Sequence, residues 1–229
     1  EPEVMDLINF LNTGGALIKV KNRTITVRGV EELKLQDYKV IPDRIEAGSY
    51  ILATMATKGR LKLNNFNPKD LALPLKLYKG MGLKIKKLSN SSYEIYCKTL
   101  KPIKKISTKE FPGYPTDLQA QLIATQLKSG LKSKVVENIF ENRFIHIPEL
   151  RRFGANLSIK GKTVTIDKTS NLQGAEVMAT DIRASFSLII AAMMSKGKTV
   201  INRIYHLDRG YEDFDLKLKK CGVNISRKK

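Results

Sequence analysis

Apolar and polar residues recur along the chain with two periods, and the switches between these periods predict a succession of helices and strands. Three apolar stretches with helical spacing each end at a Lys-Gly or Ser-Gly pair, whose glycines are Gly59, Gly130 and Gly197. A glycine just past a helix can take the left-handed conformation that ends it. The pattern therefore predicts three helices, over residues 45–57, 118–127 and 182–195.

A second glycine follows each of these by 23 to 25 residues, at Gly82, Gly154 and Gly222, and alternating apolar residues come after it. Such alternation is typical of a strand. Gly15 begins a similar hairpin, because 23–27 resembles the return strand expected at 162–166. We also expect first strands at 38–41 and 176–179, middle strands at 60–63, 132–136 and 198–201, and second helices at 69–78, 147–153 and 211–220.

These elements describe a repeated unit of about 70 residues in the order strand, helix, strand, helix, strand, strand. One unit is too small to bury both faces of its sheet, so several units must close around shared helices in an α/β fold. We expect residues 40–229 to form a three-unit domain and residues 1–39 to be the final half-unit of another domain. On this interpretation the chain begins in mid-unit, and an upstream portion is expected to be missing.

Composition adds a strong charge to this picture. The 229 residues are 42% hydrophobic, and 41 Lys and Arg against 22 Asp and Glu give a net charge of +19. Nucleic acid, an anionic membrane surface or phosphorylated small molecules could each explain that charge, as could a solvated Lys-rich surface. The lysines are scattered and aromatic residues are only 7%, which weakens the case for nucleic acid. No apolar run approaches the ~20 residues that span a bilayer, so we expect no membrane partner.

The cysteines and histidines form no metal-binding or disulfide pattern. Cys97 and Cys221 lie far apart without a CxxC motif, which favours a protein of the reducing cytoplasm. Cys97 lies in a strand-like segment and is expected to be packed. His146 and His206 are not spaced as zinc ligands, and we interpret both as structural rather than catalytic.

Three stretches carry the candidate chemistry. In 111–121, a turn with two prolines and a glycine places Asp117 at a helix start, where it either caps the helix or serves as a general base. In 178–185, Asp181 could be a cap, whereas Arg183 is a cation at a helix start and could meet an anion. In 202–212, a loop between a strand and a helix gathers charged residues, among them Arg209.

These stretches resemble the UDP-N-acetylglucosamine 1-carboxyvinyltransferase family of enolpyruvyl transferases. The motifs are FPGYPTDLQAQ (111–121), FENRFIHIPELRRFGA (140–155), GAEVMATDIRAS (174–185) and RIYHLDRGYEDF (203–214). The opening 1–16 and the segment 41–50 fit the same family. The resemblance runs through essentially the whole chain but covers only the second half of the family's length.

The resemblance implies an inside-out α/β barrel of two domains, each of three units. It also implies transfer of the enolpyruvyl group of phosphoenolpyruvate to the 3′-hydroxyl of UDP-N-acetylglucosamine with release of phosphate, the first committed step of peptidoglycan synthesis. No metal or other cofactor is implied. By the matching motifs, Asp117 is the base and contacts the sugar, Ile139 holds the nucleotide sugar through its backbone, and Arg183, Arg209 and Asp181 lie at phosphoenolpyruvate.

The family's general acid is a cysteine in its first half, and neither Cys97 nor Cys221 matches that motif. We therefore expect residues 1–229 alone to be inactive and to bind UDP-N-acetylglucosamine weakly. Two alternatives remain at this stage. One is a transferase of the 5-enolpyruvylshikimate-3-phosphate synthase type, and the other is a non-catalytic basic module that binds nucleic acid.

Overall fold

The computed structural model describes residues 1–228, and the chain divides into two compact units, Glu1–Asp43 and Arg44–Lys229. We call these the N-terminal unit and the main unit. The division falls four residues beyond the expected domain boundary at residue 39 (43 − 39 = 4). No helix within the described residues is both long enough and apolar enough to cross a bilayer.

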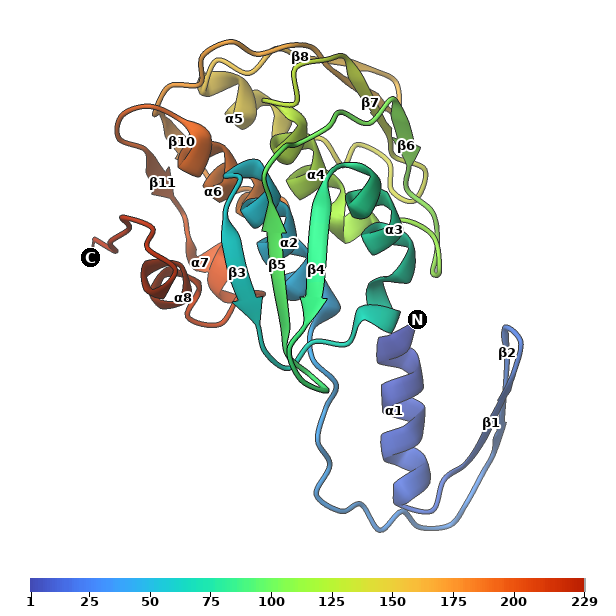
Figure 1. Cartoon of the computed structure of the whole chain (residues 1–229). Helices are drawn as coiled ribbons and strands as arrows, with labels where there is room; N and C mark the ends of the chain where they lie inside the picture. The colour runs from blue at the N-terminus through green and yellow to red at the C-terminus, as the bar shows by residue number, and fades with distance from the viewer. Residues whose placement is uncertain (229) are drawn as a thin grey trace. The chain divides into compact units, whose positions relative to one another are not determined.

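The N-terminal unit consists of one helix and one hairpin (Figure 1). The hairpin strands pair antiparallel through a two-residue turn, where Asn22 has φ 56°. Asn is one of the few residues that accept this left-handed conformation. The side chain of Asn12 holds the helix to the hairpin through two hydrogen bonds with the backbone of Ile18, both 3.0 Å long. The elements are α1 (Pro2–Thr13), β1 (Leu17–Lys21) and β2 (Thr24–Arg28).

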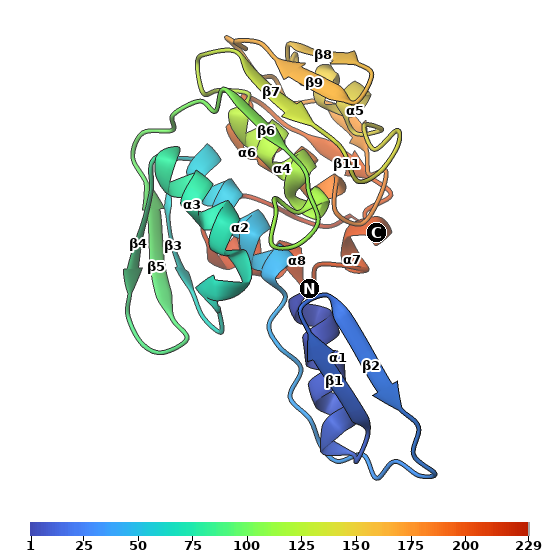
Figure 2. The same ribbon diagram turned by 90° about the vertical axis from the view of Figure 1, so that its right-hand side faces the viewer.

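The main unit arranges three sheets around buried helices (Figures 1 and 2). The first sheet is antiparallel with the order β3-β5-β4, and the third is the parallel pair β10-β11. The second has the order β6-β7-β9-β8, in which only β6 and β7 run parallel. The strands are β3 (Arg60–Leu63), β4 (Leu83–Lys87), β5 (Tyr93–Cys97), β6 (Lys105–Ser107), β7 (Ser133–Val136), β8 (Leu157–Lys160), β9 (Thr163–Ile166), β10 (Glu176–Met178) and β11 (Val200–Asn202).

Three helices form the core because their side chains are apolar or hydrogen-bonded on nearly every side. All eight residues of α4 are buried, as are most residues of α2 and α6. A helix that is apolar all round needs neighbours on all sides. The helices of the main unit are α2 (Arg44–Ala56), α3 (Ala72–Gly80), α4 (Gln119–Gln126), α5 (Ile147–Arg152), α6 (Ser185–Met194), α7 (Tyr205–Asp208) and α8 (Phe214–Lys220), with 3₁₀ turns at Pro68–Leu71 and Thr116–Leu118.

The first turns of α4 and α6 both lie beside the second turn of α2. Gln121 Nε2 in the first turn of α4 donates to Ser49 Oγ in α2 at 3.1 Å. One turn later, Thr125 Oγ1 donates to the Leu52 carbonyl at 3.3 Å, so α2 and α4 run parallel. The ring of Tyr50 in α2 meets the ring of Phe186 in the first turn of α6 at 5.4 Å. The residues that precede α4 and α6 therefore share one rim of the main unit.

Most expected elements are confirmed, with three exceptions. The strand expected at 38–41 does not form, because this segment bonds to α1: Tyr38 Oη and the Ile41 N–H both donate to the Asp6 carboxylate, at 2.8 and 3.3 Å. The strand expected after Gly222 is also absent from the described residues. The strand β6 was not anticipated, since three residues that begin with Lys105 give no alternating pattern.

Three helices begin three residues later than the pattern predicts. The helix expected from 69 begins at Ala72, because the 3₁₀ turn Pro68–Leu71 precedes it. The helix expected from 182 begins at Ser185, because the Asp181 carboxylate holds the preceding turn. The helix expected from 211 begins at Phe214, because Asp213 has φ 46° and interrupts the helical backbone.

Candidate functional site

A buried tyrosine fixes the turn that carries Asp117. Tyr114 is fully packed, and its Oη lies 2.9 Å from Tyr78 Oη and donates to the Leu118 carbonyl at 3.2 Å. Burial raises the pKa of the Tyr114 hydroxyl well above its usual value. The chain comes so close to itself here that a Cβ on Gly113 would lie 2.5 Å from Lys109 Cβ. The 3₁₀ turn Thr116–Leu118 then leads directly into α4.

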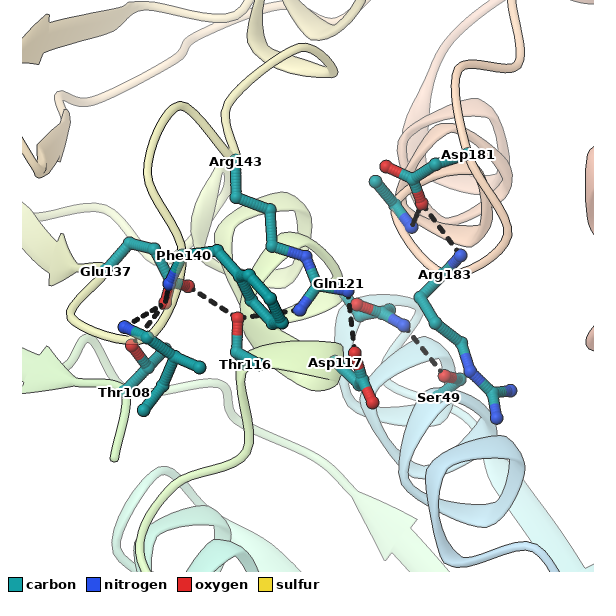
Figure 3. A network of polar contacts seen from close by, with 12 residues as sticks. Ser49, Thr108, Thr116, Asp117, Gln121, Glu137, Phe140, Arg143, Asp181 and Arg183 are labelled. Carbon is teal, nitrogen blue, oxygen red and sulfur yellow. Dashed lines mark hydrogen bonds and ion pairs between the residues drawn. The ribbon is translucent and has the colours of Figure 1, made fainter. Parts of the chain in front are cut away.

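The Asp117 carboxylate faces an arginine instead of capping its helix. Arg143 donates to Asp117 Oδ1 at 2.6 Å through one arm and to Thr116 Oγ1 at 2.8 Å through the other (Figure 3). The Phe140 ring lies on the same guanidinium, 5.0 Å from its carbon. Asp117 receives no backbone N–H, and its Oδ2 has no hydrogen-bond partner among residues 1–228. The side chain of Asp117 is 42% exposed, so this oxygen can receive a hydroxyl group from a ligand.

The neighbouring loop, residues 137–143, is organised by a buried carboxylate. Glu137 is 2% exposed, and its Oε1 accepts from the N–H groups of Ile139 and Phe140 at 2.8 and 3.2 Å. The same oxygen accepts from Thr108 Oγ1 at 2.8 Å, and Oε2 accepts from Thr116 Oγ1 at 2.8 Å. Because the Ile139 N–H is occupied, its carbonyl is the backbone group left for a ligand.

Asp181 and Arg183 lie before α6, and their roles differ. Asp181 Oδ1 accepts from the backbone N–H groups of Arg183 and Ala184 at 2.8 and 2.6 Å, which closes the turn that precedes α6. The Arg183 guanidinium donates to the Gly210 carbonyl at 3.0 Å and lies 5.3 Å from the centre of the Tyr211 ring. Arg183 is thus held against the loop between α7 and α8.

Tyr211 connects this loop to the core. Its hydroxyl lies 2.8 Å from Ser49 Oγ and accepts from Gln121 Nε2 at 3.1 Å, in a fully buried network. Gln121 lies four positions after Asp117 and is bonded to Ser49 (Figure 3), and the Tyr211 ring in turn lies 5.3 Å from the Arg183 guanidinium. Arg209, in the same loop, is exposed and has no hydrogen-bond or ion-pair partner among residues 1–228.

The histidines and cysteines take no part in this arrangement. His146 is fully buried, neither ring nitrogen has a partner, and desolvation together with the charge of Arg143 lowers its pKa to about 3. Cys97 is buried and Cys221 exposed, and both are free thiols. Within residues 1–228 no group of three or more His, Cys, Asp or Glu side chains could hold a metal ion.

The predicted residues fall in two separate networks. Asp117 and Ile139 are joined through Arg143, Thr116 and Glu137, whereas the Asp181 carboxylate binds the backbone of Arg183. Arg209 lies in the loop that the Arg183 side chain contacts. The sequence pattern does not single out the residues that hold these networks, namely Thr116, Gln121, Glu137, Arg143 and Tyr211. All five lie within or beside the quoted motifs, but only Arg143 and Glu137 carry a charge that could have drawn attention to them.

Comparison with known proteins identifies the family of this chain and several relatives. The profile of the family described as EPSP synthase (3-phosphoshikimate 1-carboxyvinyltransferase) matches residues 1–218. UDP-N-acetylglucosamine 1-carboxyvinyltransferase of Pelagibacter ubique is 49% identical over 99% of this chain and 54% of its own length. The enzyme of the same name from Bartonella henselae is 45% identical over 99% of this chain and 53% of its own length. The chain therefore spans about half the length of the curated relatives it matches.

Solved structures share the fold. The enolpyruvyl transferase NikO of Streptomyces tendae superposes with a TM-score of 0.86 at 26% identity, over 99% of this chain and 54% of that one. EPSP synthase of Acinetobacter baumannii gives a TM-score of 0.71 at 15% identity, over 97% of this chain and 55% of that one. At that identity the second match speaks for the fold alone.

Proposed function

Because this chain belongs to the EPSP synthase family, we propose that its main unit supplies one side of an enolpyruvyl transferase site. The proposed reaction moves the enolpyruvyl group of phosphoenolpyruvate to the 3′-hydroxyl of UDP-N-acetylglucosamine. A bond forms between the sugar oxygen and C2 of the donor, the bond from C2 to the phosphate oxygen breaks, and phosphate leaves. The observation that carries the proposal is the Asp117 carboxylate, held by Arg143 on a rigid turn with Oδ2 open to a ligand.

Asp117 is the proposed general base. A base must lie within hydrogen-bond reach of the hydroxyl it deprotonates, and a carboxylate held by one oxygen presents the other in a fixed direction. The Ile139 carbonyl, on the loop beside it, is the proposed backbone contact of the sugar. The guanidinium of Arg143 also offsets the negative charge that a diphosphate brings near Asp117.

Arg183 and Arg209 are the proposed partners of phosphoenolpyruvate. This substrate carries a carboxylate and a phosphate, and guanidinium groups bind both through paired hydrogen bonds. Arg209 is exposed and unpaired among the described residues, so it can contact an anion without breaking an existing bond. Asp181 is also assigned to phosphoenolpyruvate, and its bonds to the turn before α6 support the position of Arg183.

The proposed whole protein is an inside-out α/β barrel of two domains, of which the main unit is one. The N-terminal unit belongs, on this proposal, to the other domain. Its hairpin exposes apolar side chains of Leu17, Val20, Ile25 and Val27, and an isolated two-stranded hairpin is at best marginally stable in water. The general acid is expected in that other domain. The two free thiols suit the reducing cytoplasm, which is the proposed site of action.

A chimera provides the direct test. Residues 1–229 replace the matching segment of the Pelagibacter ubique relative, and phosphate release is measured with phosphoenolpyruvate and UDP-N-acetylglucosamine. We expect the chimera to turn over and the 229-residue chain alone to release no phosphate. A chimera that folds but stays inactive with both substrates would contradict the proposed activity. Turnover by the 229-residue chain alone would contradict the proposed need for a second domain.

The base assignment makes a sharper prediction. Asp117→Asn keeps the shape and the contact with Arg143 but removes the proton acceptor. We expect kcat of the chimera to fall by about 10²–10⁴-fold, the usual worth of a general base, with a modest change in KM for UDP-N-acetylglucosamine. Turnover near that of the unsubstituted chimera would remove Asp117 from the role of base.

Shikimate 3-phosphate is a second acceptor to test, because the description of the matching family names 3-phosphoshikimate. Shikimate 3-phosphate is offered to the same chimera in place of the nucleotide sugar. We expect no turnover, since the relatives of 44–49% identity bear the name of the nucleotide-sugar enzyme. Preference for shikimate 3-phosphate would transfer the proposal to the alternative substrate.

A further inference from the structure

We propose that Glu137 is a positioning residue that locks the Asp117 turn and the loop 137–143 at one fixed separation, and so shapes the nucleotide-sugar side of the site. This inference rests on the function proposed above and assigns to that site a residue that contacts no substrate. The side chain is 2% exposed and accepts four hydrogen bonds from three different segments of the chain.

The first pair of bonds folds the loop. Glu137 Oε1 draws in the N–H groups of Ile139 and Phe140, at 2.8 and 3.2 Å, which closes a tight turn around the carboxylate. The loop is also fastened to the end of β6, because the Asn138 N–H donates to Thr108 Oγ1 at 2.8 Å and Thr108 itself donates to Glu137. These bonds alone would describe a local turn stabiliser.

The bond from Oε2 extends beyond that local turn. It accepts from Thr116, the residue before Asp117, 21 positions earlier in the chain (Figure 3). The Thr116 hydroxyl also accepts from Arg143, which at the same time holds Asp117 at 2.6 Å. The Phe140 ring, whose own N–H is bound to Glu137, supports the guanidinium from its face at 5.0 Å. Glu137 therefore fixes Arg143 from two sides, and Arg143 fixes Asp117.

The consequence concerns two groups that the sugar would meet together. The Ile139 carbonyl and Asp117 Oδ2 come from segments that are not adjacent in sequence, and Glu137 is the common acceptor that ties both segments. A small error in the separation of two such groups costs a large factor in rate, because the reacting hydroxyl is then misaligned. Arg183 is tied to Gly210 and Tyr211 instead, so the phosphoenolpyruvate side does not depend on Glu137.

Two substitutions divide the network at different points. Glu137→Gln keeps the size but leaves one oxygen in place of two acceptors. Thr116→Val keeps the shape and removes only the hydroxyl between Glu137 and Arg143. Thr125→Val is the matched control: it makes the same chemical change at a buried threonine whose hydroxyl donates to the carbonyls of Gln121 and Leu52, outside this network.

Amide hydrogen exchange of the 229-residue chain, followed by NMR, tests the structural claim without any substrate. In Glu137→Gln we expect faster exchange at the amides of Ile139 and Phe140, because a neutral amide oxygen is a weaker acceptor than the carboxylate. In Thr116→Val and Thr125→Val these two amides should keep their protection. Unchanged exchange in Glu137→Gln would overturn the proposal whatever the activity of the protein.

Kinetics of the chimera test the functional claim. For both Glu137→Gln and Thr116→Val we expect kcat/KM for UDP-N-acetylglucosamine to fall by about 10–100-fold, the range typical of residues that orient a contacting group. The KM for phosphoenolpyruvate should stay within about twofold, because that side is anchored separately. The double variant should lose no more kcat/KM than the worse single variant, because both substitutions interrupt the same connection from Glu137 through Thr116 to Arg143.

The outcomes separate this proposal from the proposed function. Equal losses toward both substrates, or additive losses in the double variant, would reduce Glu137 to a general stabiliser and overturn the positioning role. If the unsubstituted chimera is inactive, the proposed function fails, and with it the claim about the sugar, while the exchange data still decide whether Glu137 fixes the loop. If Glu137→Gln fails to fold, Thr116→Val decides by the same comparison of the two substrates.

Discussion

Acidification should weaken the main unit through one buried histidine. His146 precedes α5, is inaccessible to solvent and has no hydrogen-bond partner at either ring nitrogen. Desolvation, with a smaller contribution from the charge of Arg143, lowers its pKa from 6.5 to about 3. The folded protein therefore keeps this ring neutral at pH values where the unfolded chain already binds a proton.

The sign and size of the effect follow from this difference. Above pH 6.5 both states hold a neutral ring, and no stability is lost. Between pH 6.5 and about 3, the unfolded state binds one more proton, so the free energy of unfolding falls as the pH falls. The limiting slope for one proton is about 1.4 kcal/mol per pH unit, and the loss between pH 7 and pH 5 is about 2 kcal/mol.

Urea unfolding followed by circular dichroism measures this loss, with His146→Leu as the perturbation. Subtracting the variant from the original chain at each pH cancels the titration of shared carboxylates. We expect the variant to gain about 2 kcal/mol relative to the original between pH 7 and pH 5. Ile147→Val, a change at the buried neighbour without an ionisable group, should give a difference that does not vary with pH. A constant difference for His146→Leu, or an NMR titration of His146 near 6.5, would refute the reasoning.

Three further outcomes are expected. Tyr211→Phe removes a hydroxyl shared by two buried polar groups and should lower the free energy of unfolding by about 1–3 kcal/mol in urea, where no change would contradict the network. Gly174→Ala would drive a Cβ into the Lys198 carbonyl and should lower the Tm by several degrees, about what 1–3 kcal/mol of overpacking produces, so an unchanged Tm would contradict that close approach. A maleimide should label Cys221 in the folded chain but not Cys97, because Cys97 is buried and burial raises its pKa. Mass spectrometry of the peptides identifies the labelled thiol, and labelling of Cys97 would contradict this prediction.

The regular elements could be predicted from the sequence because their signals are local. A helix such as α6 can be predicted from the apolar run over residues 188–194 and from Gly197, which follows it with φ 86°. The strand expected at 38–41 failed for a reason that no local pattern carries. Its hydrogen bonds go to Asp6, more than thirty positions away, and a segment becomes a strand only where a neighbouring strand receives its bonds.

The site divides in the same way. Asp117 and Arg183 could be singled out because a charged residue beside a turn or a helix start is unusual in itself. The sequence left open whether Asp117 caps its helix, and the Arg143 contact, 26 positions away, decides against a cap. The role of Glu137 could not be predicted, because it depends on hydrogen bonds from Thr108 and Thr116, which only the fold brings close to it.

The seam of hydroxyl and amide groups between Ser49, Gln121 and Tyr211 gives the helix layer a single permitted alignment. Two apolar helix faces can shift by one turn and form similar contacts again. The hydrogen bonds among Ser49, Gln121 and Tyr211 form in only one register of the helices. A shift of α4 along α2 would leave these three buried side chains without hydrogen-bond partners. Substitutions elsewhere in the interior can then alter volume and shape while the rim keeps its geometry.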